Sequence, residues 1–280
     1  MKNVLIFGAS GYGKRILYSL DERYIKVVAF VDNHQAKHGH MVNDVPIIPP
    51  EKIQYYQYDS IIVSVGTLEK DIKNQLMNLG VEEEKIITFH PDDKNIQWLE
   101  NRYVMARACI EEINKRQIPG NIAELGVYKG EFASYLNRFF PDKNLYLFDT
   151  FEGFDERDEH HKDEYVSSSP MFTDTNVELV LNRMQFPEKV TVKKGYFPDT
   201  AVGLEDTFCF VSLDADLYKP ILQGLEYFYP RLVSGGYIFI HDYDKVNWPG
   251  ATLAVREFSE KYNVPYLPIL DRGSSVVLAK

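Results

Sequence analysis

Three aspartates and one histidine follow directly after two apolar runs of the chain. The run FCFVSL ends before Asp214 and Asp216, and the run YIFI ends before His241 and Asp242. Carboxylates gathered at one place repel each other, so they are stable together only with a cation, a shared proton or open water between them. For any one of these acids alone, a solvated loop position is an equally good interpretation. Two acids after one run and a His-Asp pair after the other favour a functional site.

The two runs belong to a strand, helix, strand pattern. Residues 219–232 carry apolar side chains at helical spacing, and the pattern stops before Ser234, Gly235 and Gly236. Continuous apolar strands joined by a helix are typical of a parallel sheet that is covered on both faces. Neighbouring parallel strands end at the same edge of the sheet, where open α/β sheets bind their ligands. We therefore expect the three aspartates to converge at this edge.

A second candidate site begins in the segment NIAELGVYKGEFASYL, which predicts a strand that turns into a helix. Glu124, Gly126 and Gly130 stand at this turn, and Gly126 leaves out a side chain where an adenosyl group would lie against the backbone. The next predicted strand, residues 144–148, ends in Asp149, which is placed to accept both ribose hydroxyls of a nucleoside. This pair of signals is typical of the S-adenosylmethionine pocket of Rossmann-like methyltransferases.

The N-terminal segment contains another strand with a glycine-rich turn, GASGYGKR, and then a strand over residues 27–31 that ends in an acid. Glycines at such a turn let the backbone approach a phosphate, and the N-terminus of the helix supplies unpaired N–H groups. The candidate nucleotide-binding residues are Gly8, Ser10, Gly11, Tyr12, Gly13 and Asp32. The spacing GxxGxG departs from the dinucleotide fingerprint GxGxxG, so a tight turn without a ligand is the alternative interpretation.

The length of 280 residues favours two domains. We expect a boundary at Pro91-Asp92-Asp93, which separates residues 1–92 from residues 93–280, and a long helix over residues 96–115. A net charge of −10 offers no basic field that would attract nucleic acid or an anionic membrane. Cys109 and Cys209 lie in apolar surroundings, so we expect reduced core residues without a disulfide or a metal.

The first residues, MKNVLIFGAS, are expected to form a strand rather than a secretory signal, because the apolar run is short and passes into a glycine-rich turn. No apolar segment of the sequence is long enough to span a bilayer. These features predict a cytoplasmic protein, and they are compatible with a homo-oligomer.

Six motifs of the second half resemble the macrocin O-methyltransferase family, which includes enzymes that methylate sugar hydroxyls in antibiotic biosynthesis. In chain order they are IAELGVYKGEFA, LFDTFEGF, KGYFPDT, FVSLDADLY, YPRLVSGGYIFIHDY and GATLAVREF. The resemblance covers about residues 95–280. It implies a class I methyltransferase fold that uses S-adenosylmethionine and a divalent cation, usually Mg²⁺.

The resemblance also implies roles for individual residues. The positions that fall in or beside the cofactor site are Glu124, Gly126, Gly130, Asp149, Thr150, Phe151, Gly195, Tyr196 and Asp214. Asp214 and Asp242 match metal-ligand positions, and Asp216 matches the position of a general base. His241 stands where many relatives carry the first of two acids, so its imidazole could bind the metal, act as a base or point away.

The segments FVDNHQAKHGHMVNDVPII, YDSIIVSVG and GVEEEKII resemble the small Rossmann-like domain at the N-terminus of bacterial sugar O-acyltransferases and related surface-polysaccharide enzymes. The resemblance covers about residues 1–90 and implies a nucleotide-sugar site. The residue pattern predicts strands at residues 60–65 and 85–89 and a helix over residues 68–79. For the three histidines of the loop after Asp32, a solvated position is a better interpretation than a metal site.

Residues 152–184 contain a polar stretch with little periodicity, which we interpret as a mobile lid over the substrate. His160 and His161 lie among acids and could suggest a metal, but the lid is the better interpretation. Ser167 to Ser169 could contact the cofactor once such a lid closes.

Together these features predict an α/β protein with two Rossmann-like domains, a small N-terminal parallel-sheet domain and a C-terminal methyltransferase domain. The predicted activity is methyl transfer from S-adenosylmethionine to a hydroxyl of a sugar or nucleotide-sugar, in surface polysaccharide or glycoconjugate biosynthesis. Asp216 and His241 are the candidate catalytic residues, and Asp214, His241 and Asp242 are the candidate ligands of Mg²⁺ or another divalent cation. The alternatives are an NAD(P)-dependent nucleotide-sugar oxidoreductase or epimerase and a non-catalytic nucleotide-sugar binding protein.

Overall fold

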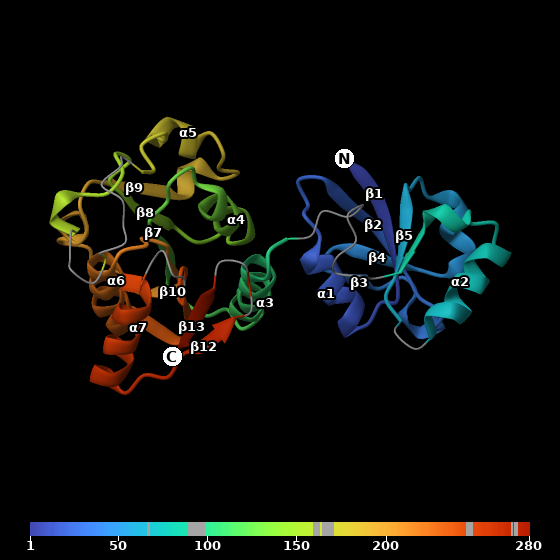
Figure 1. The fold of residues 1–280 in the computed structure, drawn as a ribbon. Coiled ribbons are helices and arrows are strands. Elements are labelled where there is room, and N and C mark those ends of the chain that lie inside the picture. The colour runs from blue at the N-terminus through green and yellow to red at the C-terminus, as the bar shows by residue number, and fades with distance from the viewer. Residues whose placement is uncertain are drawn as a thin grey trace. The chain divides into compact units, whose positions relative to one another are not determined.

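The chain folds into two compact units, Met1–Val104 and Met105–Lys280, and each unit is built around one sheet (Figure 1). The computed structural model describes residues 1–65, 68–88, 99–158, 163, 171–244, 249–269, 271 and 274–280. The expected boundary at Pro91-Asp92-Asp93 lies outside these residues, so it stays a prediction. His160, His161 and Ser167 to Ser169 also lie outside the described residues.

The N-terminal unit contains a six-stranded sheet in the order β3-β4-β2-β1-β5-β6. Its elements are β1 (Lys2–Phe7), α1 (Gly11–Ser19), β2 (Ile25–Val31), β3 (Met41–Val42), β4 (Val45–Ile48), β5 (Ser60–Val63), α2 (Glu69–Asn78) and β6 (Ile86–Thr88). Short 3-10 helices span Gln35–Lys37, Pro50–Tyr55 and Glu83–Lys85. Only β3 runs antiparallel to its neighbour among these described strands.

Alternate residues of β1 face opposite sides of this sheet. Ile6 belongs to a buried cluster with Ile16 of α1, whereas Leu5 belongs to a cluster with Ile72 and Leu76 of α2. A strand buried on both faces reads as a continuous apolar run, which is why the strand was predictable. The predicted strand at residues 60–65 is shorter in the structure, because Ser64 leaves the sheet and donates its hydroxyl to the carbonyl of Phe7 at 2.7 Å.

The C-terminal unit contains a seven-stranded sheet in the order β12-β13-β11-β10-β7-β8-β9. Its elements are α3 (Asn101–Lys115), β7 (Asn121–Leu125), α4 (Glu131–Phe139), β8 (Leu145–Asp149), α5 (Val177–Leu181), β9 (Val190–Lys194), β10 (Phe208–Leu213), α6 (Tyr218–Arg231), β11 (Leu232–Ile240), α7 (Pro249–Tyr262), β12 (Leu267–Ile269) and β13 (Ser275–Ala279). Short 3-10 helices span Glu156–Asp158, Pro187–Lys189 and Asp199–Ala201. The strands from β11 to β9 are parallel, and β13 is antiparallel to both of its neighbours. The predicted α/β class with two parallel-rich sheets is therefore confirmed.

Aromatic packing fixes the central strands of this sheet. All six residues of β10 are buried, and α6 covers β10 and β11. The ring of Phe228 on α6 meets Phe208 at 5.1 Å and Phe148 of β8 at 5.7 Å, both edge to face. Each such pair contributes about 0.5–1.5 kcal/mol beyond the burial of its area. The strands whose ends carry the acids are thus held by a rigid core.

Elements of the C-terminal unit also differ from the sequence predictions. Gly235 and Gly236, which were expected to separate the helix from the next strand, lie inside β11, because this strand already begins at Leu232. Gly235 adopts a left-handed backbone with φ +86°, and the pairing of β10 with β11 shifts between Phe208 and Phe210, so the glycines mark an irregularity within a strand. The helix expected from residue 96 is described from Asn101 onwards, and β12 and β13 were not predicted.

In the described part of the chain, no helix combines the length and the apolar character that crossing a membrane requires. Cys209 is buried and Cys109 is half-buried, and both are free thiols.

Candidate active site

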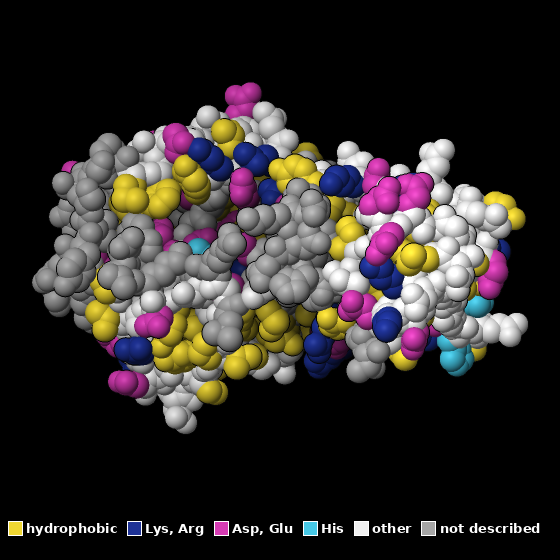
Figure 2. Space-filling view, turned by 45° about the vertical axis from the view of Figure 1, so that its right-hand side comes forward, with side chains coloured by type: hydrophobic (Ala, Val, Ile, Leu, Met, Phe, Trp, Pro, Cys, Tyr) yellow, Lys and Arg dark blue, Asp and Glu magenta, His cyan; other side chains and the backbone are white. Residues whose placement is uncertain are grey.

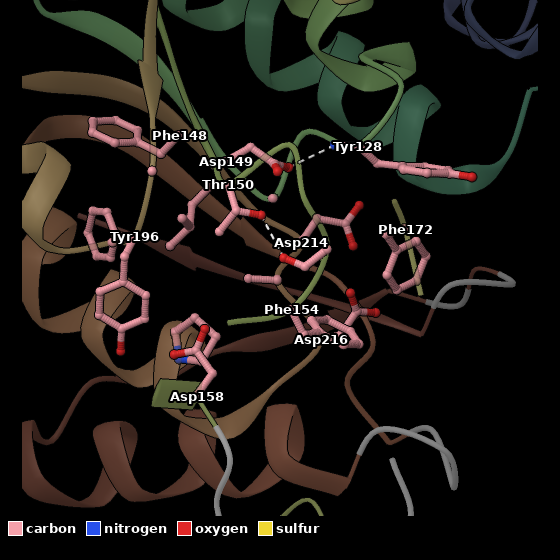
Figure 3. A pocket seen from close by; sticks show the side chains of 17 residues that line it. Tyr128, Phe148, Asp149, Thr150, Phe154, Asp158, Phe172, Tyr196, Asp214 and Asp216 are labelled. Carbon is pink, nitrogen blue, oxygen red and sulfur yellow. Dashed lines mark hydrogen bonds between the residues drawn. The ribbon is translucent and has the colours of Figure 1, made fainter. Parts of the chain in front are cut away.

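A cleft of about 660 Å³, which includes space open to solvent, lies at the carboxyl edge of the C-terminal sheet (Figure 3). Its walls come from the loops after β7, β8, β9 and β10. In Figure 3, Tyr196 and Asp158 lie at one end of the cleft, Tyr128 and Phe172 at the other, and Asp214 between them. Loops at this edge of a parallel sheet are where ligands bind in open α/β folds.

The acids after β10 and β11 converge with a histidine at this edge. The Nδ1 atom of His241 lies 2.9 Å from Oδ1 of Asp214 and 3.0 Å from Oδ2 of Asp242. One ligand atom from each of these three residues lies within 4.8 Å of the others. The side chain of Asp216 lies next to that of Asp242 and interacts with it. In Figure 2, acidic side chains gather around a histidine in a hollow of the surface.

The parallel pairing of β10 with β11 explains this convergence. Leu213 pairs with Ile240, so Asp214 and His241 leave the sheet side by side. The backbone then turns sharply, because Asp216 has φ 58° and Asp242 has φ 62°. Residues other than glycine rarely adopt this left-handed conformation, and when they do they cluster at functional sites.

The buried carboxylate of Asp242 is held in its charged form. Burial to 3% exposure would raise its pKa, but the hydrogen bond and the charge of His241 outweigh burial, so the pKa of Asp242 is lowered. The His241 imidazole therefore faces both carboxylates and does not point away. Two carboxylates and one imidazole form a donor set that fits a divalent cation, and the nitrogen suits Mn²⁺, Fe²⁺ or Zn²⁺ better than Mg²⁺.

Asp149, at the end of β8, organises the turns beside the acids. Its Oδ2 accepts hydrogen bonds from the backbone N–H groups of Val127 at 2.6 Å and Tyr128 at 2.9 Å, and its Oδ1 accepts one from Phe151 at 2.6 Å. Its backbone carbonyl accepts a further bond from the N–H of Gly195 at 2.9 Å. A carboxylate has about four acceptor positions, so little capacity is left for ribose hydroxyls unless the turns adjust.

The structure gives Gly126 a packing role, and its predicted contact with an adenosyl group stays a prediction. It has φ +82°, and a Cβ atom built there would lie 2.1 Å from the backbone carbonyl oxygen of Asp214. The absent side chain thus lets the loop after β7 touch the loop after β10. Gly130 opens α4 with φ +75°, and a Cβ there would lie 2.9 Å from Val180. Both glycines are needed for packing before any ligand is considered.

The other predicted cofactor residues differ in their relation to the cleft. Gly126, Asp149, Thr150, Gly195, Tyr196 and Asp214 line it. Glu124, Gly130 and Phe151 are not among the described residues that line it. Glu124 is 2% exposed and accepts a hydrogen bond from Ser212 at 3.3 Å. The roles of all these residues toward a cofactor stay predictions.

Two groups of lining residues were missed by the sequence analysis. Asp158 is the last residue of the 3-10 helix Glu156–Asp158, and it is 7% exposed. Mainly because of this burial, the pKa of Asp158 is raised to about 6. Half-buried aromatic rings form the second group: Phe172 meets Tyr128 at 5.2 Å and Phe154 at 5.4 Å, edge to face. The aromatic letters were visible, but no periodicity in residues 152–184 places them on one wall.

The N-terminal unit has a second cleft of about 1120 Å³, including open space, lined by Gly8, Ser10, Tyr12, Asp32 and Lys37 among others. Gly11 and Gly13 were predicted here as well, but they are not among the described lining residues. A Cβ on Gly13 would lie 1.9 Å from the carbonyl oxygen of Gly8, so Gly13 serves the packing of α1 on the turn.

Asp32 stabilises the turn after β1 through hydrogen bonds, as Asp149 stabilises the turn after β7. Its Oδ2 accepts from the N–H of Ala9 at 2.9 Å and pairs with Nζ of Lys37 at 2.7 Å. Burial would raise the pKa of Asp32, but these bonds and the N–H of His34 lower it. The loop histidines join no cluster of metal-binding groups in the described residues.

Comparison with known proteins places these observations in a family context. A family model described as Macrocin-O-methyltransferase (TylF) matches residues 99–271, and a model described as C2185-like, N-terminal matches residues 1–87. Demethyldecarbamoylnovobiocin O-methyltransferase of Streptomyces niveus is 25% identical over 175 residues, which cover 56% of this chain and 65% of that protein. An 8-demethyl-8-(2,3-dimethoxy-alpha-L-rhamnosyl)-tetracenomycin-C 4'-O-methyltransferase of Streptomyces olivaceus is 29% identical over 149 residues, covering 48% of this chain and 57% of that protein. The matches thus span less than two thirds of these relatives.

Solved structures share the fold. The O-methyltransferase NovP aligns with a TM-score of 0.56 and 22% identity, covering 62% of this chain and 77% of NovP. The calicheamicin methyltransferase CalS11 aligns with a TM-score of 0.52 and 18% identity, covering 81% of this chain and 96% of CalS11. At these identities the likeness concerns the fold alone, and it confirms the predicted class I methyltransferase fold.

Proposed function

This chain belongs to the macrocin O-methyltransferase family, and from that membership and the geometry of the cleft we propose that it transfers a methyl group from S-adenosylmethionine to a sugar hydroxyl. One observation carries the proposal: Asp214 belongs both to the cleft lined by Asp149 and Gly195 and to the cluster of His241 and Asp242. A methyl donor in the cleft therefore lies next to groups that can activate an acceptor.

The chemistry assigns a separate task to Asp216. In methyl transfer, an oxygen–carbon bond forms while the sulfur–carbon bond breaks, and the sulfonium becomes a neutral thioether. The hydroxyl proton must leave as the oxygen attacks. Asp216 lines the cleft and is the carboxylate that we propose accepts this proton as the general base.

We propose that Asp214, His241 and Asp242 hold a divalent cation, with His241 as a ligand through Nδ1. When bound, such a cation polarises a sugar hydroxyl and lowers its pKa. The chain's own residues fix the site: Asp242 is buried and charged, and the register of β10 with β11 sets the spacing of Asp214 and His241. The imidazole favours Mn²⁺ or Fe²⁺ at least as much as the expected Mg²⁺.

The aromatic wall supports a sugar acceptor. Tyr128, Phe154 and Phe172 present half-buried rings to the cleft near Asp216. The apolar C–H faces of a sugar ring pack well on such rings. The tetracenomycin relative, whose name contains a rhamnosyl group, offers independent support for this class of acceptor.

We further propose that the N-terminal cleft binds the nucleotide or carrier part of the acceptor. Ser10 and Tyr12 lie at the N-terminus of α1, where backbone N–H groups favour an anion, and Lys37 adds a positive charge. A nucleotide-sugar or glycan intermediate of surface polysaccharide or glycoconjugate biosynthesis combines these features. The alternative of an oxidoreductase or epimerase would place the chemistry in this cleft and leave the C-terminal cluster unused.

An assay of methyl transfer to a panel of nucleotide sugars tests the proposal. We expect turnover that a chelator abolishes and that Mn²⁺ or Mg²⁺ restores. Asp214→Ala should lower turnover by about a hundredfold or more, whereas Asp142→Ala, an exposed acid away from the cleft, should not change it. Full activity with chelator and in Asp214→Ala would remove the metal role. Failure to bind S-adenosylhomocysteine would remove the methyltransferase proposal.

A further inference from the structure

Asp158 is a buried acid whose side chain lines the donor cleft (Figure 3). It is 7% exposed, and its Oδ1 atom has no hydrogen-bond partner among the described residues. A buried carboxylate oxygen without a protein partner is costly, so it calls for a partner from outside the chain, such as a ligand, an ion or a water molecule. Neither the activation of a hydroxyl nor the binding of a cation, as proposed above, uses this residue.

The position of Asp158 in the cleft indicates which part of the donor it meets. We place the ribose of the donor near the end of β8, the position that a nucleoside takes in other folds of this type, whether or not the carboxylate of Asp149 itself binds it. The sulfonium must extend from there toward Asp214 and Asp216, because the methyl group has to reach the acceptor. The adenine of the donor must then extend in the opposite direction, toward the loop after β9, where Figure 3 shows Tyr196 beside Asp158.

This end of the cleft is held in place by neighbouring side chains. The guanidinium of Arg157 lies 3.7 Å from the centre of the Tyr196 ring and also binds Asp155 at 2.7 Å and Asp199 at 3.0 Å. The charged groups that act on Asp158 are Asp155, Lys219 and Arg157, and the hydroxyl of Tyr196 lies beside it. The carboxyl group is thus held beside the ring of Tyr196, a planar side chain against which a purine can pack.

From this geometry we propose that Asp158 accepts a hydrogen bond from the exocyclic amine of the donor's adenine and makes the site selective for that base. The amine carries two N–H donors, and the free Oδ1 atom is an acceptor at the correct end of the cleft. The inference rests on the proposed use of S-adenosylmethionine. It identifies a residue that recognises adenine and that lies outside the glycine and acid motifs of the sequence.

The test compares two ligands by calorimetry at pH 7.5 on the full chain: S-adenosylhomocysteine and its analogue in which unsubstituted purine replaces adenine. Loss of a hydrogen bond to a charged group weakens binding by about tenfold to a hundredfold, so the wild type should prefer the adenine compound by that factor. Asp158→Ala should bind both compounds equally. Asp158→Asn should keep most of the preference, because its amide oxygen still accepts.

The matched control is Asp199→Asn, which removes another carboxylate bound to Arg157 but does not line the cleft, and it should retain the full preference. Equal binding of both ligands by the wild type would overturn the inference and leave the methyltransferase proposal intact. If Asp158→Ala still preferred S-adenosylhomocysteine as strongly as the wild type, another group would bind the amine, and the inference would be wrong. Failure of both ligands to bind the wild type would instead refute the use of this donor.

Discussion

The tasks proposed for the four polar residues after β10 and β11 can be separated, because their side chains differ in burial and partners. Asp242 is buried and its pKa is lowered, and His241 faces both Asp214 and Asp242. Asp216 lies outside the three-residue cluster but contacts Asp242. A carboxylate that binds the cation cannot readily accept a proton, so Asp216, which lies outside the cluster and lines the cleft, is better suited to that task than the three cluster residues.

Asp216→Asn tests this division. The amide cannot accept a proton, so we expect kcat to fall by about 10²- to 10⁴-fold. The affinity for S-adenosylhomocysteine and for Mn²⁺, both measured by calorimetry, should stay within about twofold of the wild type. An unchanged kcat would exclude Asp216 as the base. A loss of Mn²⁺ binding would instead make it a ligand.

Asp158→Asn should stabilise the protein in a pH-dependent manner. The folded pKa of Asp158 is about 6 against an ordinary value of 3.8, so the folded state holds its proton more tightly than the unfolded state. Its ionisation therefore costs stability progressively as the pH rises from about 4 to 6, and the cost is constant above pH 6.

The asparagine variant removes that cost, which is about 3 kcal/mol at pH 8 and about half as much at pH 5. Urea unfolding followed by circular dichroism at both pH values measures the difference. Asp199→Asn, an exposed acid, should show little change at either pH. A stabilisation that is equal at both pH values would mean that Asp158 does not titrate in this range.

Sequence reasoning found the acids after the strands but missed Asp158. The former were predictable because a strand end can be read from a local apolar run, and parallel strands end together. Asp158 stands in a polar stretch, and its burial depends on Tyr196 and on the loop after β9, which lie far away in the sequence. Burial that arises from such distant contacts leaves no periodic signal in the residues themselves.

At the scale of elements, both units use one device to hold a strand-to-helix turn. The acid that ends the second strand of each unit, Asp32 or Asp149, accepts N–H groups from the turn after the first strand. A hydrogen bond to a charged acceptor is about twice as strong as a neutral one, so the acid sets the shape of the turn. In a nucleotide fold such acids are usually read as ribose ligands, whereas here they first act as supports.

Gly126→Ala should damage this support in the C-terminal unit. Its added Cβ would lie 2.1 Å from the carbonyl oxygen of Asp214, so the loop after β10 would have to move. Gly203 is a matched control with φ +79°, close to the +82° of Gly126, and no described atom lies within 4 Å of its added Cβ. Both variants carry the strain of a left-handed alanine, which costs about 1 kcal/mol.

We expect Gly126→Ala to lose at least about 2 kcal/mol more than Gly203→Ala in urea unfolding, and to weaken Mn²⁺ binding as Asp214 shifts. Equal losses in the two variants would show that the close approach of the loops can relax without cost.

The order of the main elements could largely be predicted, but irregular strands could not. Apolar runs predicted β1, β2, β5, β7, β8 and β10 with small shifts at their ends. β11 was shortened in the prediction, because Gly235 and Gly236 are typical helix stops and their role inside a strand depends on the irregular pairing with β10. β12 and β13 owe their strand state to the pairing of β13 with β11, which a local pattern does not contain.

At the scale of the whole molecule, each unit carries a sheet with a cleft at an edge where strands turn into helices. The cleft of the C-terminal unit is lined by Asp214 and Asp216, and Asp214 connects it to the cluster with His241 and Asp242. The N-terminal cleft lacks a comparable cluster of acids in the described residues, and its charged groups are Asp32 and Lys37. A cleft of this composition is suited to binding part of a substrate without acting on it.

This division predicts how a mutation in the N-terminal cleft alters kinetics. Lys37 neutralises Asp32 at 2.7 Å, so Lys37→Ala leaves an uncompensated negative charge where a phosphate is expected. Binding energy from a remote part of the substrate that is equal in the ground and transition states affects KM alone. We therefore expect the KM for a nucleotide sugar to rise about tenfold, with kcat and the Kd for S-adenosylhomocysteine unchanged.

Lys73→Ala, which removes a lysine paired with Glu83 on the same unit, should leave all three values unchanged. If Lys37→Ala lowered kcat without a change in KM, the N-terminal cleft would take part in catalysis and not only in binding, because only interactions made in the transition state alter kcat alone.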